Sequence, residues 1–353
     1  MNCSLPKRNM SFPPVVVGRV SIVIPAYNNS ATIVKTIESC LAQKYSDVEI
    51  IVVNDGSSDK TAEILDSFGG RIKTIHQKNG GIAHARNVSV QAASGEFIAW
   101  MDADDIAEQD RLAKQQLVLA HYEDIALVST SFSAFSDDPN DLIENYETVY
   151  YGAPNRIGGM NKIYPRKIPI SGLAGDTSVY VGECRELLLW GNFVHPPTVM
   201  VRRNAFEKVG LFDTGLLYSS DYDWILRASR LGPFAFIQKS LLRYRLGAGQ
   251  ISQRASAKIP LETIRVIKKI RQSDPALVSK NLPAIKAKIA ECWLDAAEGA
   301  IVTSRLLALN YLWQSAIRKP ANIALARVLA KAVLPKFAVA IAKKFALAIG
   351  IFR

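Results

Sequence analysis

Three aspartates lie within four residues of one another, at Asp102, Asp104 and Asp105. They directly follow the apolar run 97–101, which has the composition of a buried strand. Carboxylates this close repel one another unless a cation lies between them, and hard divalent cations such as Mg²⁺ prefer oxygen ligands. The cluster therefore predicts a Mg²⁺ or Mn²⁺ site that bridges to diphosphate oxygens. The alternative is an acid-rich helix N-terminus, which the helix dipole stabilises.

A second polar run, 54–59, ends the apolar stretch 48–53. Its short side chains could hydrogen-bond a nucleobase edge or a ribose, with Gly56 permitting close approach. Taken alone, a solvent-exposed turn is the commoner explanation of such residues. Two glycines at 80–81 precede a predicted helix that contains Arg86, an arrangement that fits a nearby phosphate or acid cluster.

A fourth feature is Asp221, at the start of a predicted helix that runs to Arg230. A carboxylate far in sequence from the metal cluster suits a general base, which must stay free of the cation. Capping of that helix explains the residue equally well. Neither G-x-G-x-x-G nor G-x-x-x-x-G-K-[ST] occurs, so dinucleotide binding and P-loop hydrolysis lack their usual motifs.

Strand and helix patterns alternate in the region that must position these groups. We expect strands at 20–24, 48–53, 72–76, 96–101 and 126–129, with helices at 33–41, 61–68, 82–93 and 110–122. Pro25 is expected to end the first strand. Strands separated by single helices predict an α/β fold with a largely parallel sheet, whose ligand lies at the carboxyl ends of the strands. Asp55 and Asp102 both fall there.

The second half of the chain is less regular. Residues 136–191 are rich in Gly, Pro and Tyr and predict a loop-rich, partly helical excursion that could cover a cleft. Strands are then expected at 198–201, 234–238 and 241–245, and helices at 204–209 and 221–230. From position 261 the pattern is almost entirely helical, with breaks near Pro275, Pro283, Pro320 and Pro335.

Charge is distributed unevenly along the 353 residues, whose net charge is +11. From position 255 on there are 17 basic and 5 acidic residues, with no acid after Glu298, whereas the preceding part is nearly neutral. The 49% hydrophobic content excludes a disordered chain. Four scattered cysteines without a C-x-x-C pair indicate a reducing compartment. No apolar window is long enough to predict a transmembrane helix.

The basic C-terminal segment 336–352 predicts an amphipathic helix, with Lys336, Lys343 and Lys344 on one face. Such helices commonly lie in the interface of an anionic membrane. The alternative is a helical bundle that packs against the catalytic domain or a second subunit. Nucleic acid is not expected as a partner, because base-stacking aromatic residues do not alternate with the charge.

Taken together, the motifs resemble those of family 2 glycosyltransferases, which have the GT-A fold. The resemblance covers about residues 20–252 and is carried, in order, by runs at 20–28, 53–59, 79–87, 97–105, 195–203, 210–213 and 221–227. It implies an α/β fold of GT-A type, with a mostly parallel nucleotide-binding sheet flanked by helices, and an all-helical basic extension. The expected division is a tail at 1–19, a catalytic domain at 20–254 (donor half 20–130, acceptor half 131–254) and the extension at 255–353.

The resemblance also implies roles for individual residues. The nucleotide-sugar-binding residues would be Pro25, Ala26, Tyr27, Asn54, Asp55, Arg86, Asp102 and Asp104. Asp104 and Asp105 would hold the metal, Mg²⁺ or Mn²⁺, and Asp221 would be the base that deprotonates an acceptor hydroxyl, with inversion at the anomeric carbon. The implied donor is a nucleotide-diphosphate sugar, with UDP favoured, and the implied acceptor is a glycan or lipid-linked intermediate. The expected location is cytoplasmic, peripheral at the inner face of the membrane.

The chain departs from the family pattern in three places. Where relatives often have Tyr-Arg-x-His, it has Tyr-Arg-Leu-Gly at 244–247, so Arg243, Arg245 or Gln250 would have to replace the histidine. Only the second acid of the usual Glu-Asp pair is present, at Asp221. No Q-x-x-R-W motif occurs, which favours single addition over processive synthesis. A non-catalytic nucleotide-sugar-binding scaffold and a sugar nucleotidyltransferase are the alternative functions.

Overall fold

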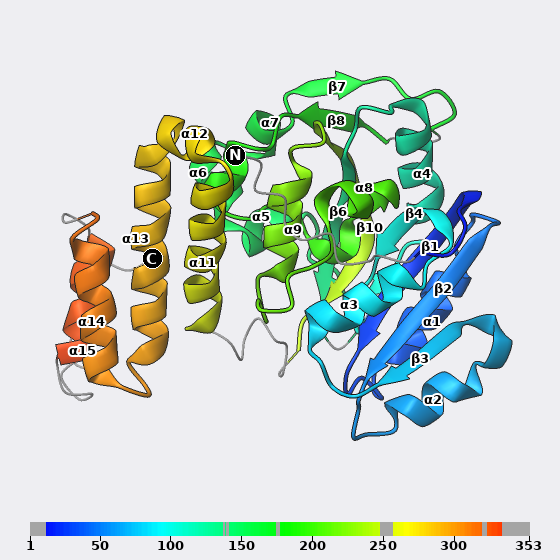
Figure 1. Cartoon of the computed structure of the whole chain (residues 1–353), viewed down its shortest axis with the longest axis horizontal. Coiled ribbons are helices and arrows are strands. Elements are labelled where there is room, and N and C mark those ends of the chain that lie inside the picture. Colours follow the sequence, from blue (N-terminus) through cyan, green and yellow to red (C-terminus); the bar gives the residue numbers. More distant parts are fainter. Residues whose placement is uncertain are drawn as a thin grey trace. The chain divides into compact units, whose positions relative to one another are not determined.

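The computed structural model describes residues 12–136, 138, 141–173, 177–247, 257–319 and 323–333. The chain divides into two compact units, Met1–Ala248 and Gly249–Arg353 (Figure 1). The first unit contains the sheet and all of the predicted site residues, and the described part of the second is helical.

A mixed sheet of ten strands, counted over the described residues, forms the centre of the first unit. Its order is β3-β2-β1-β4-β9-β6-β10-β8-β7, and β5 pairs with β10. The strands are β1 Val16–Ala26, β2 Val48–Asp55, β3 Lys73–Gln77, β4 Gly95–Trp100, β5 Ile106–Ala107, β6 Leu127–Phe135, β7 Arg166–Ile168, β8 Val179–Gly182, β9 Met200–Arg202 and β10 Phe234–Arg245.

Helices connect these strands and cover the sheet. They are α1 Ile33–Leu41, α2 Thr61–Ser67, α3 Ile82–Gln91, α4 Arg111–His121, α5 Glu147–Tyr150, α6 Gly152–Ile157, α7 Met160–Ile163, α8 Asn204–Val209 and α9 Ser220–Ala228, with short 3₁₀ turns at Gly69–Arg71, Leu187–Trp190 and Pro196–Thr198. The alternation of strand and helix predicted for the first 130 residues is thus confirmed, and so is the α/β class.

The parallel part of the sheet is the part that the βα alternation predicted. Strands β3, β2, β1 and β4 run parallel to one another, and β6 runs parallel to β10. Strand β9 lies antiparallel between β4 and β6, and β7 and β8 extend the sheet antiparallel beyond β10. The expectation of a largely parallel sheet therefore holds for the donor half, and the rest is mixed.

Two strand predictions were wrong in detail. Strand β1 continues through Pro25 to Ala26. The carbonyl of Val23 points toward β4 and accepts a hydrogen bond from the N–H of Met101. Backbone groups two residues apart in a strand point to the same side, so the nitrogen of Pro25 also points toward β4. Strand β4 has already ended at that level, so the missing N–H of Pro25 costs no hydrogen bond of the sheet. The two short strands expected at 234–238 and 241–245 are one strand, β10, whose register shifts on both sides of Ser240. These irregularities interrupt the alternating pattern and make one strand resemble two.

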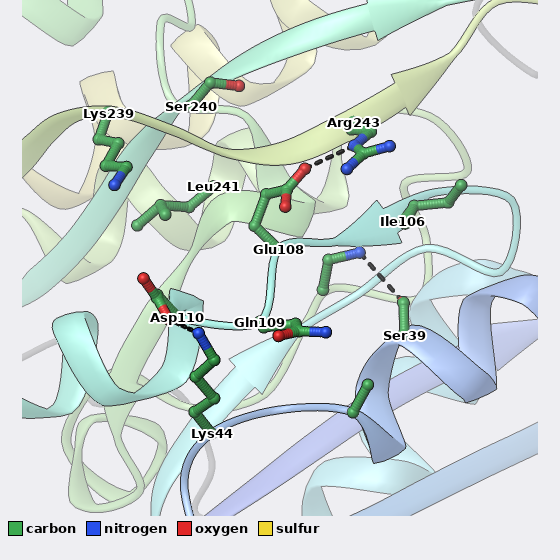
Figure 2. A pocket seen from close by; sticks show the side chains of 12 residues that line it. Ser39, Lys44, Ile106, Glu108, Gln109, Asp110, Lys239, Ser240, Leu241 and Arg243 are labelled. Carbon is green, nitrogen blue, oxygen red and sulfur yellow. Dashed lines mark hydrogen bonds and ion pairs between the residues drawn. The ribbon is translucent and has the colours of Figure 1, made fainter. Parts of the chain in front are cut away.

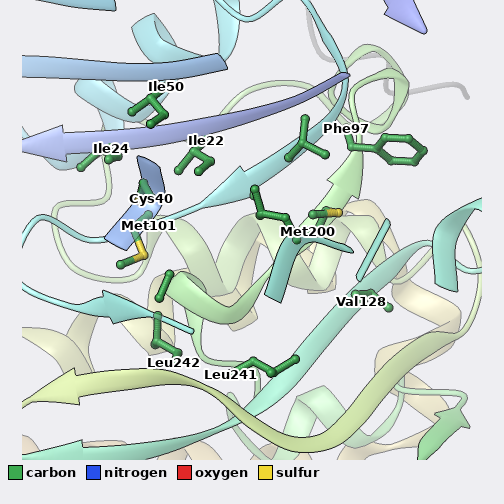
Figure 3. Packing of buried hydrophobic residues seen from close by; sticks show 14 of the residues in the cluster. Ile22, Ile24, Cys40, Ile50, Phe97, Met101, Val128, Met200, Leu241 and Leu242 are labelled. Carbon is green, nitrogen blue, oxygen red and sulfur yellow. The ribbon is translucent and has the colours of Figure 1, made fainter. Parts of the chain in front are cut away.

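The main hydrophobic core lies on one face of this sheet. Alternate residues of the parallel strands, including Ile22, Ile50 and Phe97, pack with Cys40 of α1 and Leu112 of α4 (Figure 3). On the opposite face, Trp100 contacts an aromatic group formed by Phe206, Phe212 and Trp224. Both faces of the strand that precedes the aspartate cluster are therefore fixed by packing.

Five helices form the described part of the second unit: α11 Lys258–Ser273, α12 Pro275–Lys280, α13 Leu282–Ala300, α14 Arg305–Ala316 and α15 Ile323–Val333. The predicted breaks at Pro275 and Pro283 are confirmed, since these prolines lie in the first turns of α12 and α13. Pro320, Pro335 and the basic segment 336–352 lie outside the described residues. None of the described helices is long and apolar enough to cross a membrane.

Candidate active site

The strand pairing brings the predicted donor-binding segments to one edge of the sheet. In the parallel pairs, Ala26 of β1 lies beside Asn54 of β2, and Val23 of β1 lies beside Trp100 of β4. The loops after Ala26, Asp55 and Trp100 therefore emerge at the same edge. This is the edge at which the aspartate cluster was expected.

The aspartate cluster concentrates negative charge in a partly dry environment. Asp102 is about one-third exposed, with its side chain 31% accessible, and its Oδ1 accepts a hydrogen bond of 3.0 Å from Arg86. Asp104 is half-buried, and burial together with the charge of Asp102 raises the pKa of its carboxyl to about 6. Burial, reinforced by Asp104 and Asp102, holds the pKa of Asp105 well above its usual value. The positive charges of Arg86, which contacts Asp102, and of Arg245, which lowers the pKa of Asp104 and Asp105, oppose this rise only in part.

The buried carboxylate of Asp105 links the cluster to strand β10. Its Oδ1 accepts from the backbone N–H of Arg245 at 3.1 Å, and its Oδ2 has no hydrogen-bond partner among the described residues. Nε of Arg245 donates to the backbone oxygen of Asp104 at 3.0 Å, and its guanidinium lies over the ring of Phe135. Of the replacements considered for the missing histidine, Arg245 therefore lies at the cluster, whereas Gln250 lies outside the described residues.

Arg243, the other candidate replacement, is directed elsewhere. It forms an ion pair with Glu108 in a hollow beside β5, where Lys44 pairs with Asp110 (Figure 2). Two of the cationic groups of this hollow are thus matched by neighbouring carboxylates. Apart from Arg243, the hollow contains none of the residues predicted to bind the donor, the metal or the acceptor.

The donor set around Asp104 suits a hard divalent cation that is shared with a ligand. Among the described residues, no group of three or more His, Cys, Asp or Glu side chains could enclose an ion on its own. Mg²⁺ in particular is often held by one or two carboxylates together with substrate phosphates and water. The unpartnered Oδ2 of Asp105 and the raised pKa of Asp104 are what such a cation would relieve.

Asp55 holds the glycine loop rather than standing free. Its carboxylate accepts hydrogen bonds of 2.8 Å from the N–H groups of Gly80 and Gly81 and of 2.6 Å from Nε2 of Gln77. Gly56 has a φ of 71°, and a Cβ there would lie 2.7 Å from the backbone nitrogen of Asn79. The close approach that Gly56 permits is therefore that of the neighbouring loop.

Asn54 is likewise engaged inside the protein. Its Oδ1 accepts from the N–H of Ser57 at 3.1 Å, and its Nδ2 lies 3.0 Å from Nδ1 of His76. The side chain is buried, at 4% exposure. These contacts shape the turn that follows β2.

The loop after β1 is bound to the turn after β2. Asn28, at a φ of 54°, donates its N–H to Ser57 and accepts from the N–H of Ser58 through Oδ1. Ala26 is buried, whereas Tyr27 is 50% exposed. This pair of cross-linked loops forms a preorganised rim on the donor side.

Asp221 lies in the first turn of α9 and is half-buried. Burial raises the pKa of its carboxyl, and the positive charge of Arg86 opposes that rise. Asp102 also acts on this pKa, so residues from α3, β4 and α9 share one electrostatic environment. Its helical neighbour Asp223 differs, because it is 1% exposed and forms an ion pair of 2.9 Å with Arg227.

Helix α3 fixes the segment that leads to Asp221. The side chain of Asn87 bonds both backbone groups of Phe212, donating to its oxygen at 2.9 Å and accepting from its N–H at 2.8 Å. The guanidinium of Arg86 lies over the ring of the same phenylalanine. One turn of α3 therefore locates both the cluster partner Arg86 and the approach to α9.

A tyrosine–histidine pair adjoins these groups and was not assigned from the sequence. Oη of Tyr151 lies 3.1 Å from Nδ1 of His195, whose ring stacks on Phe132 with centroids 4.1 Å apart. Burial lowers the pKa of His195 to about 3, and burial raises that of Tyr151, with Asp221 among the charges that add to the rise. Both side chains are thus neutral. Only tertiary contact brings them together, so no spacing in the sequence could have revealed the pair.

Comparison with known proteins agrees with this fold. The model of glycosyl transferase family 2 matches residues 21–210. An uncharacterized glycosyltransferase of Rickettsia typhi is 28% identical over 236 residues, which make up 67% of this chain and 66% of the relative. The match spans only 31–36% of the length of three other Rickettsia relatives.

Two solved structures resemble most of the chain at low identity. S. aureus TarS 1–349 in complex with UDP-GlcNAc has a TM-score of 0.55 at 16% identity, covering 85% of this chain and 89% of that one. The mannosyltransferase PcManGT of Pyrobaculum calidifontis, in complex with GDP-Man and Mn²⁺, has a TM-score of 0.53 at 18% identity, covering 93% and 90%. The fold is therefore GT-A, the fold of a class of nucleotide-sugar-dependent glycosyltransferases. Within that class, the chain belongs to glycosyl transferase family 2.

Proposed function

We propose that this protein transfers a sugar from a nucleotide-diphosphate sugar, with a UDP-sugar favoured, to an acceptor hydroxyl. The observation that carries the proposal is the shared environment of Asp102, Arg86 and Asp221, which come from three distant parts of the chain. The donor would enter at the sheet edge formed by β1, β2 and β4. Binding of UDP-GlcNAc by TarS and of GDP-Man by PcManGT supports this class of donor.

On the donor side, Tyr27 would cover the nucleobase, because its ring is half-exposed at the rim. Pro25 and Ala26 would form the wall beneath it. Asp55 would contact the base and would also hold the 77–81 loop in place through its hydrogen bonds to that loop. Asn54 would act as a positioning residue, since its amide holds the turn.

At the diphosphate, Asp104 and Asp105 would hold Mg²⁺ or Mn²⁺, with Asp102 near the ribose or the phosphates. The cation would supply charge neutralisation for the departing diphosphate. The Mn²⁺ of PcManGT supports this choice of metal. Arg86 already contacts Asp102, and its positive charge would also stabilise the negative charge that develops on the leaving group.

Asp221 would act as general base. Its carboxylate would accept the proton of the acceptor hydroxyl as that oxygen bonds to the anomeric carbon. The bond from this carbon to the diphosphate oxygen would break at the same time, and the electron pair would leave with the nucleoside diphosphate. Attack from the opposite face inverts the anomeric centre. Burial that raises the pKa of Asp221 makes it a better proton acceptor.

The acceptor we propose is a glycan or lipid-linked intermediate, extended by one sugar per encounter. The basic C-terminal part would hold the enzyme at an anionic membrane surface where such lipids reside. Residues 141–173 and 177–191, which carry the short helices α5–α7, would contact this acceptor.

The test compares Asp221→Asn with the neighbouring Asp223→Asn. With a lipid extract as the acceptor pool and Mn²⁺ present, release of UDP should fall about 10³-fold in the first variant. The thermal shift produced by UDP and Mn²⁺ should stay as in the wild type. Asp223→Asn should lower the melting temperature by loss of its ion pair with Arg227, yet retain most turnover once folded.

Two results would contradict the proposal. Unchanged turnover in Asp221→Asn would exclude this residue as the base. A wild-type protein that binds UDP-sugars but releases no UDP with any acceptor lipid would instead be a non-catalytic nucleotide-sugar-binding scaffold.

A further inference from the structure

Helix α14 of the C-terminal unit exposes large apolar side chains. Leu306 is 82% exposed, Trp313 66% and Ile317 54%, and Val302 in the preceding turn is 91% exposed. Spacings of seven and four residues place Leu306, Trp313 and Ile317 on one face of the helix, with Asn310 between them. We call these four apolar side chains the α14 face.

The opposite side of the same helix is already used for packing. Ala308 and Leu312 are buried, the latter in a small core with Leu294 of α13 and Val328 of α15. Ser315 donates to the carbonyl of Ala290 at 2.8 Å. Figure 1 shows α14 beside α13 and α15 within this unit. A helix that is apolar on both sides normally has both sides covered, and an exposed apolar patch of this kind marks an interaction surface.

The charges next to the α14 face indicate what covers it. Arg305 precedes the face, and Arg318 and the exposed Lys319 follow it. No acidic residue occurs in the sequence after Glu298. Apolar side chains with Arg305, Arg318 and Lys319 next to them are complementary to a surface that is apolar beneath and anionic at its rim. Trp313 adds a side chain that favours the boundary between water and lipid.

We propose that the α14 face docks onto the surface of an anionic lipid bilayer. Leu306, Trp313 and Ile317 would enter the acyl boundary, and the flanking basic residues would lie among the head groups. This inference rests on the proposed use of a membrane-linked acceptor, and it assigns the contact to described residues rather than to 336–352.

Vesicle binding by the full chain tests this surface. Cosedimentation would be compared for vesicles of phosphatidylcholine alone and of equimolar phosphatidylcholine and phosphatidylglycerol. Leu306→Gln and Trp313→Gln together should weaken binding to the mixed vesicles by about a hundredfold, since each removes apolar burial worth about tenfold in affinity. Lys319→Gln should weaken binding about fivefold, and salt should reduce that difference.

Val17→Gln is the matched control, because Val17 is also 82% exposed but lies at the start of β1 in the catalytic unit. It should leave vesicle binding unchanged. The thermal shift with UDP and Mn²⁺ should stay normal in every variant. If the wild-type protein shows no thermal shift with UDP and Mn²⁺, the proposed function is contradicted, whereas the proposed docking surface is not.

Fluorescence quenching gives a second measurement that does not depend on the double variant. Brominated lipids should quench part of the emission of the wild-type chain, which has five tryptophans, and Trp313→Phe should lose that quenched fraction. Quenching that persists in Trp313→Phe would overturn the proposal. So would unchanged vesicle binding of the double variant. A changed oligomeric state, or a lower melting temperature with vesicle binding retained, would assign the face to a second copy or to another part of the chain.

Discussion

The loops after β1 and β2 and the segment after β4 meet at one sheet edge. The aspartates of the loops are stabilised by hydrogen bonds, whereas the environment of the aspartates after β4 disfavours their charge. In the loops, Asp55 and Asp59 each accept hydrogen bonds from two backbone N–H groups. In the segment after β4, burial and mutual repulsion raise the pKa of Asp104, and one oxygen of Asp105 lacks a partner among the described residues. The loops therefore gain stability from their carboxylates, whereas Arg86 and Arg245 balance the charge of the cluster only in part.

The largest expected effect comes from the cluster. Asp104→Asn should reduce transfer by about 10³-fold, because it removes a carboxylate that we propose faces the cation and diphosphate. The variant should also lose the dependence of donor binding on Mn²⁺. Its melting temperature without ligand should not fall, since the carboxylate is electrostatically unfavourable in the free protein.

Asp110→Asn is the contrasting control. Asp110 lies six residues further on and forms ion pairs with the exposed Lys44 and with the buried Lys114. It should keep the response to Mn²⁺, with a loss of about 1–3 kcal/mol in unfolding free energy, because the buried ammonium of Lys114 loses its carboxylate partner. Thermal shift with UDP over a Mn²⁺ titration measures both. If Asp104→Asn responds to Mn²⁺ as the wild type does, the aspartate cluster does not bind the cation and does not differ from the loops in this respect.

The next effect comes from the loops and should appear as lost stability. Gly56→Ala places a Cβ 2.7 Å from the backbone nitrogen of Asn79, at a φ of 71°. We expect a loss of about 3 kcal/mol in unfolding free energy, because neither the steric contact nor the left-handed backbone can relax cheaply. Urea unfolding measures it.

Gly69→Ala provides the matched control, with a φ of 54° but no atom within 4 Å of the added Cβ. Its loss should stay near 1 kcal/mol, the backbone contribution alone. Equal losses in the two variants would mean that the contact with Asn79 does not hold the turn.

These two regions also differ in how far the sequence predicted them. The strand ends that carry Asp55 and Asp102 followed from the βα alternation, because parallel strands place their carboxyl ends at one edge. The roles of Asn54 and Gly56 could not be predicted in the same way. Their contacts, His76 and Asn79, come from the following strand and loop, and a turn sequence does not state which loop will pack on it.

Residues 131–254, the predicted acceptor half, were less predictable for a physical reason. Strands β7 and β8 are short and antiparallel, so they lack both the length and the apolar runs of the parallel strands. The pairing of Tyr151 with His195 joins positions 44 residues apart. The sequence and the resemblance to the family suggested Asp221 as the base, but only the structure shows that the neighbouring Asp223 forms an ion pair with Arg227.

A smaller effect tests whether the tyrosine–histidine pair belongs with the cluster or with the structural loops. Tyr151→Phe removes the hydrogen bond to His195 and should reduce unfolding free energy by about 1 kcal/mol. Since His195 adjoins the environment of Arg86 and Asp221, we expect the KM for acceptor to rise several-fold while donor binding is unchanged.

Tyr122→Phe is the control for this variant, because its hydroxyl donates to the carbonyl of Pro169 at 2.8 Å on an exposed part of the surface. It should show the small stability change without the change in KM. If Tyr151→Phe also leaves KM as in the wild type, the pair is structural and belongs with the loops.

The smallest effect concerns pH. Burial alone would raise the pKa of Asp59, but hydrogen bonds from Thr61 and Ser30 outweigh it and lower the value to about 2. Because the folded-state pKa is depressed, the stabilisation is complete above the unfolded value of 3.8 and is lost as pH falls from about 4 toward 2. The group is partly exposed and screened by solvent, so the contribution should be less than about 1 kcal/mol. Urea unfolding of the wild type and Asp59→Asn should therefore give a constant difference above pH 4 that shrinks below it. A difference independent of pH would show that these loops are held by their backbone bonds alone and not by the charge of Asp59.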